Sequence, residues 1–470
     1  MSGRAHIAVV GGGITGLVAA RSLIRSSNSN SNSNSFGPRV TLLEASDRLG
    51  GKIQSVPFAG TTVDVGPEAL FTQLPAAIEL CGELGLGDEL VAPAQSKTTV
   101  WTRGRLRELA PGILGGLPDG VVPIARSGIL SPRGAARAGV DLVLPNGNGK
   151  HEDESVGALI RRRLGNEAAD RMIDPLLGGI YGGDPDTLSL RATAPRLNVL
   201  AQDNRSLIRG LMAAGRRAAP STSAPMFKTL PGGLERITSG LASEMAEAEL
   251  CCGERVHALT PLPDGGYQLR TTSDRVLEVD GVILAIPAHC AAELLSESAP
   301  AAATELAGID YNPITVMWLA FAPTALPPLP PGSGFLVPRV DKRMISACTW
   351  ASAKWRHLAI PDQMLLRCSV GRGRPEATEL DDDALVSGAL ADLREAIGVR
   401  ADPTESLVVR FDRAMPQYAV GHLERVARLK AAITELPRVK LAGAAYGGIG
   451  IPQCITQGEE AAARLASELW

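Results

Sequence analysis

The chain has 470 residues, 45% of them hydrophobic and 21% charged, and its formal net charge is −3. This length exceeds what one ordinary core accommodates, so two or three lobes are expected. The charge balance provides no overall positive field, which argues against a nucleic-acid partner. The seven cysteines and six histidines are scattered without the spacing of a metal site, so free thiols and no metal are predicted.

The N-terminal segment predicts a strand at 6–10, a turn at 11–16, a helix to about residue 24 and a second strand within RVTLLEA. The polar stretch SSNSNSNSNSFGP between that helix and strand is typical of a disordered surface loop. We find no signal peptide and no apolar run of the ~18 residues that a membrane span needs, so we expect a cytoplasmic protein.

The rest of the chain alternates helical and β-rich regions. A helix-rich stretch at about 75–215 is followed by β-rich segments at about 254–287 and 309–375, the latter typical of an antiparallel sheet. The C-terminal VKLAGAAYGGIGIPQCITQGEE repeats the N-terminal order of strand, glycine turn and helix. The predicted fold class is α/β with α+β insertions, in which a discontinuous nucleotide domain is closed by its own C-terminus.

A G-x-G-x-x-G pattern, Gly11, Gly13 and Gly16, lies between the first strand and the first helix. The first glycine permits a tight turn, the second lets the backbone approach a pyrophosphate, and the third allows close helix–strand packing. Glu44 ends the second strand, where a carboxylate can bind ribose hydroxyls. The polar loop explains why Glu44 lies further along than the usual spacing of about 20 residues.

The next segment, ASDRLGGKIQS, adds an R-x-G-G pattern from Arg48 to Gly51. Together with GGGITG and Glu44 it resembles the flavin-containing amine oxidase superfamily. The resemblance implies a Rossmann-like FAD domain of the amine oxidase type, with one non-covalent FAD per chain rather than NAD. The implied cofactor residues are Gly11, Gly12, Gly13, Ile14, Thr15, Gly16, Glu44, Ala45, Arg48, Gly51, Lys52, Gly66, Pro67, Glu68, Ala69, Val256, Phe411, Gly443, Ile449, Gly450 and Ile451.

Three further segments narrow the resemblance: GGIYGGDPDTLSLRATAP, MPQYAVGHLERV and AGAAYGGIGIPQCI. They are similar to the oxygen-dependent protoporphyrinogen and coproporphyrinogen oxidases of haem biosynthesis, nearly end to end. The resemblance implies an FAD domain (1–75, 228–300 and 405–470), a mixed-sheet substrate domain (76–103 and 301–404) and a helical domain (104–227). It also implies three hydride transfers from a porphyrinogen to the flavin, which O2 reoxidises with release of H2O2.

The same resemblance implies the residues that contact substrate. Arg107 stands where the family has an arginine that pairs with a propionate, and a guanidinium can bind a carboxylate bidentately. Gly179 matches a glycine whose carbonyl faces the macrocycle, and Cys348 and Ser369 match residues that flank it. Ser369 and the nearby Arg372 make this lining more polar than in relatives that use protoporphyrinogen, which favours coproporphyrinogen III with its four propionates.

Alternatives remain open at this point. Protoporphyrinogen IX is the second substrate candidate, and an amine oxidase or a non-catalytic flavin or haem-delivery protein is less favoured. An amine oxidase would be expected to have an aromatic cage and a lysine near the flavin; only 4% of the residues are aromatic and no such lysine could be assigned. Residues 110–130 are either internal packing or a peripheral membrane contact. Transfer of product to a ferrochelatase, and the choice between monomer and homodimer, are also open.

Overall fold

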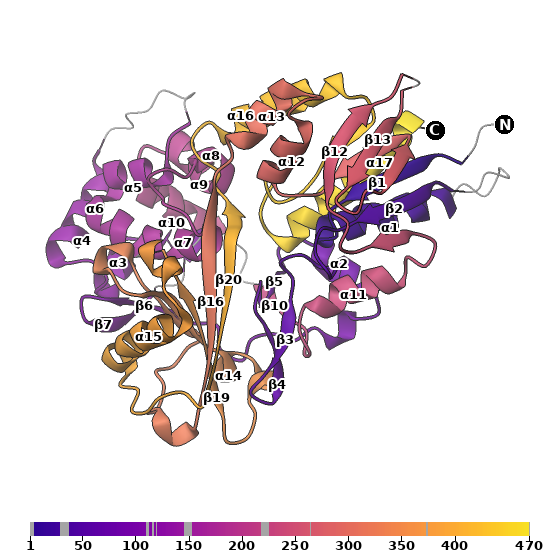
Figure 1. The fold of residues 1–470 in the computed structure, drawn as a ribbon. Helices are drawn as coiled ribbons and strands as arrows, with labels where there is room; N and C mark the ends of the chain where they lie inside the picture. The colour runs from indigo at the N-terminus through magenta and orange to yellow at the C-terminus, as the bar shows by residue number, and fades with distance from the viewer. Residues whose placement is uncertain are drawn as a thin grey trace.

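A computed structural model describes residues 4–28, 37–109, 112–114, 117–118, 120–144, 153–217, 225–263, 265–372 and 375–469. Figure 1 shows a lobe built from both ends of the chain on one side, and a second sheet with long strands joined to a group of helices on the other. The SNSN loop and part of the 110–130 segment lie outside the described residues.

The first lobe is organised around a five-stranded parallel sheet. Its strands, in spatial order, are β11 (Glu249–Cys251), β2 (Arg39–Leu43), β1 (His6–Val10), β15 (Gly281–Leu284) and β21 (Val439–Leu441). In the central strand β1, Ile7 and Val9 enter one core and Ala8 and Val10 the other. Both faces are therefore buried, which explains why HIAVV is a continuous apolar run rather than an alternating one.

Helices cover both faces of this sheet. One core is closed by α1 (Ile14–Asn28), α2 (Ala76–Glu83), α11 (Glu235–Ser243) and α17 (Ile451–Leu469). The other is closed by α12 (Ala288–Leu295), α13 (Pro300–Ala307), α16 (His422–Ala432) and a meander of β12 (Val256–Pro261), β13 (Tyr267–Thr271) and β14 (Val276–Val279). The predicted Rossmann-like lobe, closed by the C-terminal helix against the first helix, is confirmed.

The second sheet has seven strands and is mixed. Its spatial order is β20 (Glu405–Pro416), β16 (Tyr311–Phe321), β19 (Met364–Val370), β18 (Ile345–Trp350), β17 (Gly334–Leu336), β6 (Thr98–Thr102) and β7 (Arg105–Glu108). Along β16, Met317 and Leu319 pack toward α15 (Asp382–Ile397), whereas Val316 and Trp318 pack on the opposite face with Val65. This period-two alternation gives the sheet one covered face and one face toward the first lobe.

The helical group forms its own core. Its helices are α3 (Val121–Ser127), α4 (Pro132–Gly139), α5 (Val156–Leu164), α6 (Asn166–Ala168), α7 (Asp174–Tyr181), α8 (Leu190–Thr193), α9 (Pro195–Asp203) and α10 (Leu207–Arg217). Ser131, Ser155 and Ser189 cap α4, α5 and α8 by accepting a hydrogen bond from a backbone N–H three residues on. Such caps stabilise a helix start by about 1 kcal/mol.

Small elements connect these parts: hairpins of β3 (Ser55–Phe58) with β4 (Thr61–Asp64) and β8 (Gly112–Leu114) with β9 (Leu117–Pro118), the pair β5 (Leu70–Phe71) and β10 (Phe227–Lys228), and α14 (Ala351–Lys354). Two predicted domain limits need correction. β20 was placed with the FAD domain but pairs with β16 in the seven-stranded sheet. Helix α2 was placed with the substrate domain, but Ala77 and Leu80 pack in the core of the first lobe.

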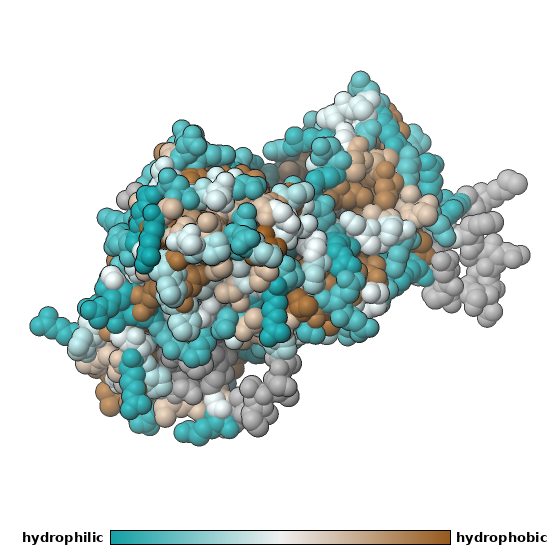
Figure 2. Space-filling view, turned by 90° about the horizontal axis from the view of Figure 1, so that it is seen from below, coloured by the Kyte–Doolittle hydropathy of each residue, from teal (hydrophilic) through white to brown (hydrophobic). Residues whose placement is uncertain are grey.

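The surface seen from below carries small groups of hydrophobic side chains separated by hydrophilic ones (Figure 2). No helix within the described parts of the chain is both long and apolar enough to cross a membrane.

Candidate active site

The two glycine motifs of the sequence meet at one edge of the parallel sheet. Strands β1, β2, β15 and β21 all run in the same direction, so their carboxyl ends lie together. The segments leaving this edge are the glycine turn at 11–13, Glu44, and a loop at 442–450 that we call the C-terminal glycine loop. Open α/β sheets bind their ligands at this edge.

The N-terminal turn has the shape that a dinucleotide pyrophosphate requires. Gly11 has φ +108°, and a Cβ there would stand 2.5 Å from the carbonyl oxygen of Ala285. A Cβ on Gly16 would collide with the backbone of Gly11, whereas at Gly13 nothing lies within 4 Å of the Cβ position. This open cradle lies at the N-terminus of α1, whose free N–H groups and dipole favour an anion.

Glu44 is fixed beside this turn. Its Oε2 accepts a hydrogen bond from Gly12 N at 2.6 Å, and its Oε1 accepts bonds from Ser46 N and Oγ at 2.8 Å. The backbone carbonyl of Glu44 accepts a hydrogen bond from Glu254 N at 2.8 Å, two residues before Val256. The structure thus brings the predicted ribose carboxylate close to Val256, another of the implied cofactor residues, although more than 200 residues separate them.

Arg48 has a local structural role in the RLGGK segment. Its guanidinium donates to the carbonyls of Leu49 and Ile53, each at 2.9 Å, and so closes its own loop. Gly50 N donates to Gly12 O at 2.8 Å, which joins this loop to the glycine turn. Arg48 therefore shapes the surface on which the cofactor is expected to lie.

Lys52 points toward the second sheet. Its side chain is open to solvent, yet its Nζ lies 6.0 Å from the ring centroid of Tyr311 in the second sheet. Burial lowers the pKa of its ammonium, because protein surrounds the group at slightly longer range. Lys52 is therefore an accessible cation that faces the second sheet.

The segment 66–69 lies between Lys52 and the second sheet. A Cβ on Gly66 would collide with the carbonyl of Lys52, so the two backbones touch. Gly66 O accepts a hydrogen bond from Arg367 Nη2 at 2.9 Å. Glu68 forms an ion pair with Lys354, and its Oε2 lies 3.8 Å from Nε of Arg367. Burial alone would raise the pKa of Glu68, but these two cations hold it below its ordinary value.

Sequence reasoning missed Lys354 and Arg367. Lys354 lies at the end of α14 and Arg367 within β19, and no local pattern links either of them to Glu68. Only the approach of the second sheet to the 66–69 segment places them there. Lys354 is thus a partly buried lysine on the wall of the predicted flavin site, where no lysine could be assigned before.

The two predicted ring-flanking residues lie on opposite faces of the second sheet. Ser369 pairs with Ala347 and Val316, on the face toward the first lobe. Cys348 pairs directly with Cys368 and is buried under α15. The prediction that Cys348 lines the substrate site is therefore wrong, because a shift of one residue along a strand reverses the face.

Arg107 lies on β7 and contacts the helical group. A Cβ on Gly128, which ends α3, would stand 2.5 Å from the Nη1 of Arg107. The Arg107 Nε is buried without a hydrogen-bond partner in the described structure. This N–H group could donate a hydrogen bond to a ligand oxygen. The propionate role of Arg107 stays a prediction.

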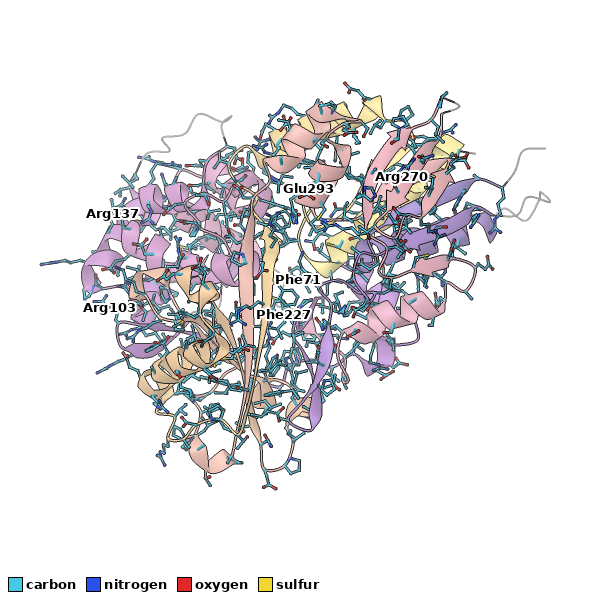
Figure 3. All side chains as sticks on the ribbon, viewed as in Figure 1. Phe71, Arg103, Arg137, Phe227, Arg270 and Glu293 are labelled. Atoms are coloured by element: carbon cyan, nitrogen blue, oxygen red, sulfur yellow. The ribbon has the colours of Figure 1, made fainter. Side chains whose placement is uncertain are left out.

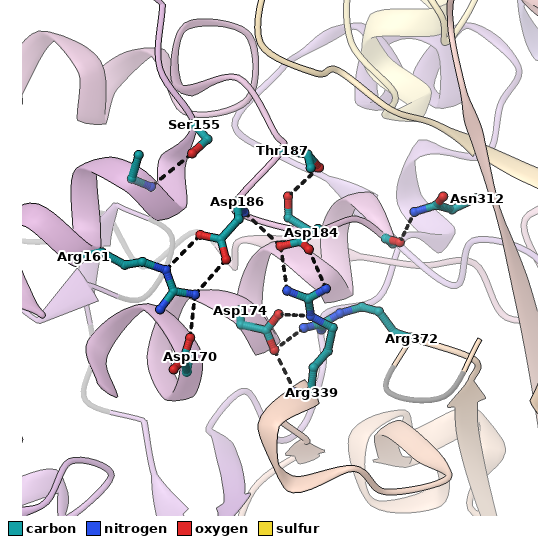
Figure 4. Close-up of polar contacts among 12 residues, drawn as sticks. Ser155, Arg161, Asp170, Asp174, Asp184, Asp186, Thr187, Asn312, Arg339 and Arg372 are labelled. Atoms are coloured by element: carbon teal, nitrogen blue, oxygen red, sulfur yellow. Dashed lines mark hydrogen bonds and ion pairs between the residues drawn. The ribbon is translucent and has the colours of Figure 1, made fainter. Parts of the chain in front are cut away.

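Arg372 lies in a buried ion network rather than in the open site (Figure 4). Its Nη2 lies 2.5 Å from Asp174 Oδ2, and only 8% of its side chain is exposed. Asp174 also accepts from Arg339 Nε at 2.7 Å, and Arg339 binds Asp184 with both Nη atoms. A side chain at Gly178 would overlap the Arg372 guanidinium. Arg372 is thus shared with Asp174, and its propionate role stays a prediction.

Three other groups face the space between the lobes. Gly179 on α7 is exposed, with only the Leu336 side chain 3.7 Å from its Cβ position, which suits a backbone that contacts substrate. Phe411 lies on β20 opposite Ile314 and is half-buried. The rings of Phe71 and Phe227 stand 5.8 Å apart, and in Figure 3 they lie at the centre of the molecule.

The C-terminal glycine loop borders an opening. A cavity of about 540 Å³ is lined by Tyr446 and Gly447 of the loop and by residues of α2, α16 and α17. Gly443 has φ +134°, with nothing within 4 Å of its Cβ position. Ile449, Gly450 and Ile451 lead from this loop into α17.

The parallel sheet, the glycine cradle and the Glu44 carboxylate beside it are the arrangement of a dinucleotide-binding protein of the flavoprotein class. Residues 14–466 match the family of flavin containing amine oxidoreductases, and the chain belongs to this family. FAD is its cofactor, and the open cradle at Gly13 beside the Glu44 carboxylate fits it.

Individual relatives cover the chain almost completely. It is 33% identical to a coproporphyrinogen III oxidase of Bacillus subtilis over 98% of this chain and 97% of the relative. It is 30% identical to a protoporphyrinogen oxidase of Bos taurus, with 98% of each chain covered. A crystal structure of a protein provisionally named a protoporphyrinogen oxidase, from Exiguobacterium sp. 255-15, superposes with a TM-score of 0.86 at 29% identity, covering 100% of this chain and 99% of that one.

Proposed function

We propose that the protein oxidises coproporphyrinogen III to coproporphyrin III. The observation that carries the proposal is similarity over the whole length to a coproporphyrinogen III oxidase, at 33% identity. The protoporphyrinogen oxidase of Bos taurus is similar over the same length at 30%, so protoporphyrinogen IX is the alternative substrate.

The reaction removes six electrons and six hydrogens from the porphyrinogen and converts three O2 to three H2O2. FAD, when bound, supplies the hydride acceptor and the reaction with O2. The chain's own residues have to bind the macrocycle, orient one carbon at a time toward the cofactor, and exclude water. The Ser369 face of the second sheet and the exposed backbone at Gly179 suit this task.

Coproporphyrinogen III carries four propionates and protoporphyrinogen IX two, so the arginines available to bind carboxylates bear on the choice of substrate. Arg372 shares its charge with Asp174, which weakens its case as the ligand of an extra propionate, although its Nε is buried without a partner in the described structure. Arg107, whose buried Nε also has no partner and whose guanidinium has no carboxylate beside it among the described contacts, is the stronger candidate for carboxylate binding. We place the protein in the cytoplasm, with residues 110–130 as a candidate peripheral membrane contact and a ferrochelatase as a candidate acceptor of the product.

The deciding experiment compares both porphyrinogens with purified FAD-loaded protein, following porphyrin fluorescence, O2 uptake and H2O2 release. A higher kcat/KM for coproporphyrinogen III, with one H2O2 per two electrons, supports the proposal. A higher kcat/KM for protoporphyrinogen IX favours the alternative. Oxidation of neither above the rate without enzyme contradicts both, and a panel of primary amines then tests an amine oxidase.

A further inference from the structure

The MPQYAVGH segment joins two distant parts of the chain. Tyr418 O accepts a hydrogen bond from Ser189 N at 2.7 Å, and Gln417 Nε2 donates to Tyr181 O at 3.1 Å. Both partners belong to the IYGGDPDTLS segment at the end of α7 and the start of α8. The backbone around Tyr418 is therefore attached to the helical group.

The side chain of Tyr418 reaches the opposite way, into the C-terminal glycine loop. Its hydroxyl donates to Ala444 O at 2.6 Å and accepts from Gly448 N at 2.7 Å. The two bonds span most of the loop, and they use both the donor and an acceptor position of one hydroxyl. Only 3% of Tyr418 is exposed, so solvent does not compete for these bonds.

The Tyr418 ring is itself held by packing. The His422 ring stacks on it at 4.0 Å between centroids and 13° between planes, and the Tyr181 ring stands 6.2 Å away. Burial lowers the pKa of His422 to about 4, so this stack contains a neutral imidazole near neutral pH. Four of the five tyrosines of the chain, all but Tyr267, gather in this region.

The loop needs support from outside because its own backbone is permissive. Gly443 and Gly448 have φ values of +134° and +121°, which glycine adopts without a steric penalty. Glycine is also free to leave these conformations. The loop's ends are anchored in β21 and in α17, which lies so close to α1 that a Cβ on Gly458 would stand 2.5 Å from Thr15 O. Between these anchors, the Tyr418 hydroxyl binds both halves of the loop.

We propose that Tyr418 is a positioning residue that holds the C-terminal glycine loop in its FAD-binding conformation and registers the loop to the helical group. The inference rests on the proposed cofactor role of residues 443–451 and is independent of which porphyrinogen is oxidised. Tyr418 thereby couples the helix that carries Gly179 to the sheet edge that carries the cofactor. Ordering a flexible loop when FAD binds would lower the affinity, whereas a loop that is already ordered avoids this entropic cost.

The test is Tyr418→Phe, which keeps the ring and its stack and removes only the hydroxyl. The matched control is Tyr267→Phe: Tyr267 is buried in the same lobe and donates to Pro437 O at 2.5 Å, before β21 and so at the opposite end of that strand. For each apoprotein, FAD titration gives the dissociation constant, visible circular dichroism of the bound flavin reports its surroundings, and thermal unfolding without FAD reports stability.

The expected result is an FAD dissociation constant raised about tenfold in Tyr418→Phe, because Gly448 N loses its acceptor. The flavin dichroism should change as well, while Tyr267→Phe stays within twofold of the native protein and has its native flavin spectrum. Native affinity and spectrum in Tyr418→Phe would overturn the inference. Equal loss of affinity in both variants, in proportion to lost apoprotein stability, would also overturn it. None of these readouts depends on a porphyrinogen.

Discussion

Arg372 and Asp174 form a buried ion pair, 2.5 Å between Nη2 and Oδ2, although one follows a strand of the second sheet and the other begins α7. The Asp174 carboxylate also accepts hydrogen bonds from the side chain and from the backbone N–H of Arg339. One carboxylate thus attaches helix α7 to two separate segments of the sheet region. The pair places the Arg372 guanidinium directly against Gly178 of α7.

Removing Asp174 should therefore be costly. Asp174→Ala leaves two arginines without their shared carboxylate, and such a loss destabilises by about 3–5 kcal/mol. Urea unfolding of the variant measures the change. The control is Asp402→Ala, which removes the 78% exposed partner of Arg394 and should cost less than about 1 kcal/mol. Equal costs for the two variants would show that the Asp174 network does not stabilise the fold.

Gly13→Ala should weaken FAD binding while preserving the fold. The Cβ position of Gly13 is open in the protein, so the apoprotein should unfold at its native temperature. The added methyl group would occupy the cradle that the pyrophosphate needs. Gly82→Ala is a fair comparison, because that position in α2 is equally open and lies away from the sheet edge. FAD titration should distinguish them; unchanged affinity in Gly13→Ala would contradict the assigned cradle.

Asp64 should make stability fall as pH rises. Burial raises the pKa of its carboxyl to about 6 from 3.8, so the folded protein binds this proton more tightly than the unfolded chain. Below about pH 4 both states are protonated; the stabilisation is then lost progressively up to about pH 6. Asp64→Asn cannot ionise and keeps an acceptor for Ser55 and Leu234. It should match the native protein at pH 3.5 and exceed it by about 3 kcal/mol above pH 6.

Asp184 provides the opposite slope as a control for that titration. Although burial opposes it, hydrogen bonds from Arg339 lower the pKa of Asp184. Its contribution to stability is therefore present at neutral pH and lost on acidification. Asp184→Asn should lose stability at pH 7, and its deficit should shrink as pH falls. If the free energy of unfolding of both variants depended on pH in the same way between pH 3.5 and 8, these assignments would be contradicted.

Substitutions at Ser369 and Cys348 should differ in their effect on substrate choice. Ser369 faces the first lobe, so Ser369→Met should lower kcat/KM for coproporphyrinogen relative to protoporphyrinogen, by about tenfold. Cys348 is buried under α15, so Cys348→Ala should lower stability and leave that ratio unchanged. A changed ratio in Cys348→Ala would mean that the assigned sheet face is incorrect.

Arg107→Ala should raise KM for the porphyrinogen more than it lowers kcat, since a propionate is bound alike in the ground and transition states. Loss of one charge-assisted contact corresponds to about tenfold or more in KM. Arg105→Ala removes a neighbouring exposed arginine from the same strand and should leave KM near its native value. Equal KM values for both variants would show that Arg107 does not bind the substrate.

Much of the fold could be predicted because its signals are local. The strand, glycine turn and helix at each end of the chain depend on hydrophobic period and on glycine conformation, which neighbouring residues determine. The parallel sheet and the antiparallel character around 309–375 followed from such patterns. The domain limits at α2 and β20 were less accurate, since an element's membership depends on its packing partner rather than on its own composition.

The sequence alone was enough to predict a dinucleotide site at Gly11–Gly16 beside Glu44, because spacing and residue type carry that signal. Only the tertiary structure decided how the charged groups are used. Arg372 meets Asp174, Lys354 meets Glu68, and Tyr418 spans the C-terminal glycine loop, each across more than 25 residues of chain. Coulombic and hydrogen-bond partners depend on distance in space, and strand faces reverse with a single residue. Neither property is recorded in local sequence.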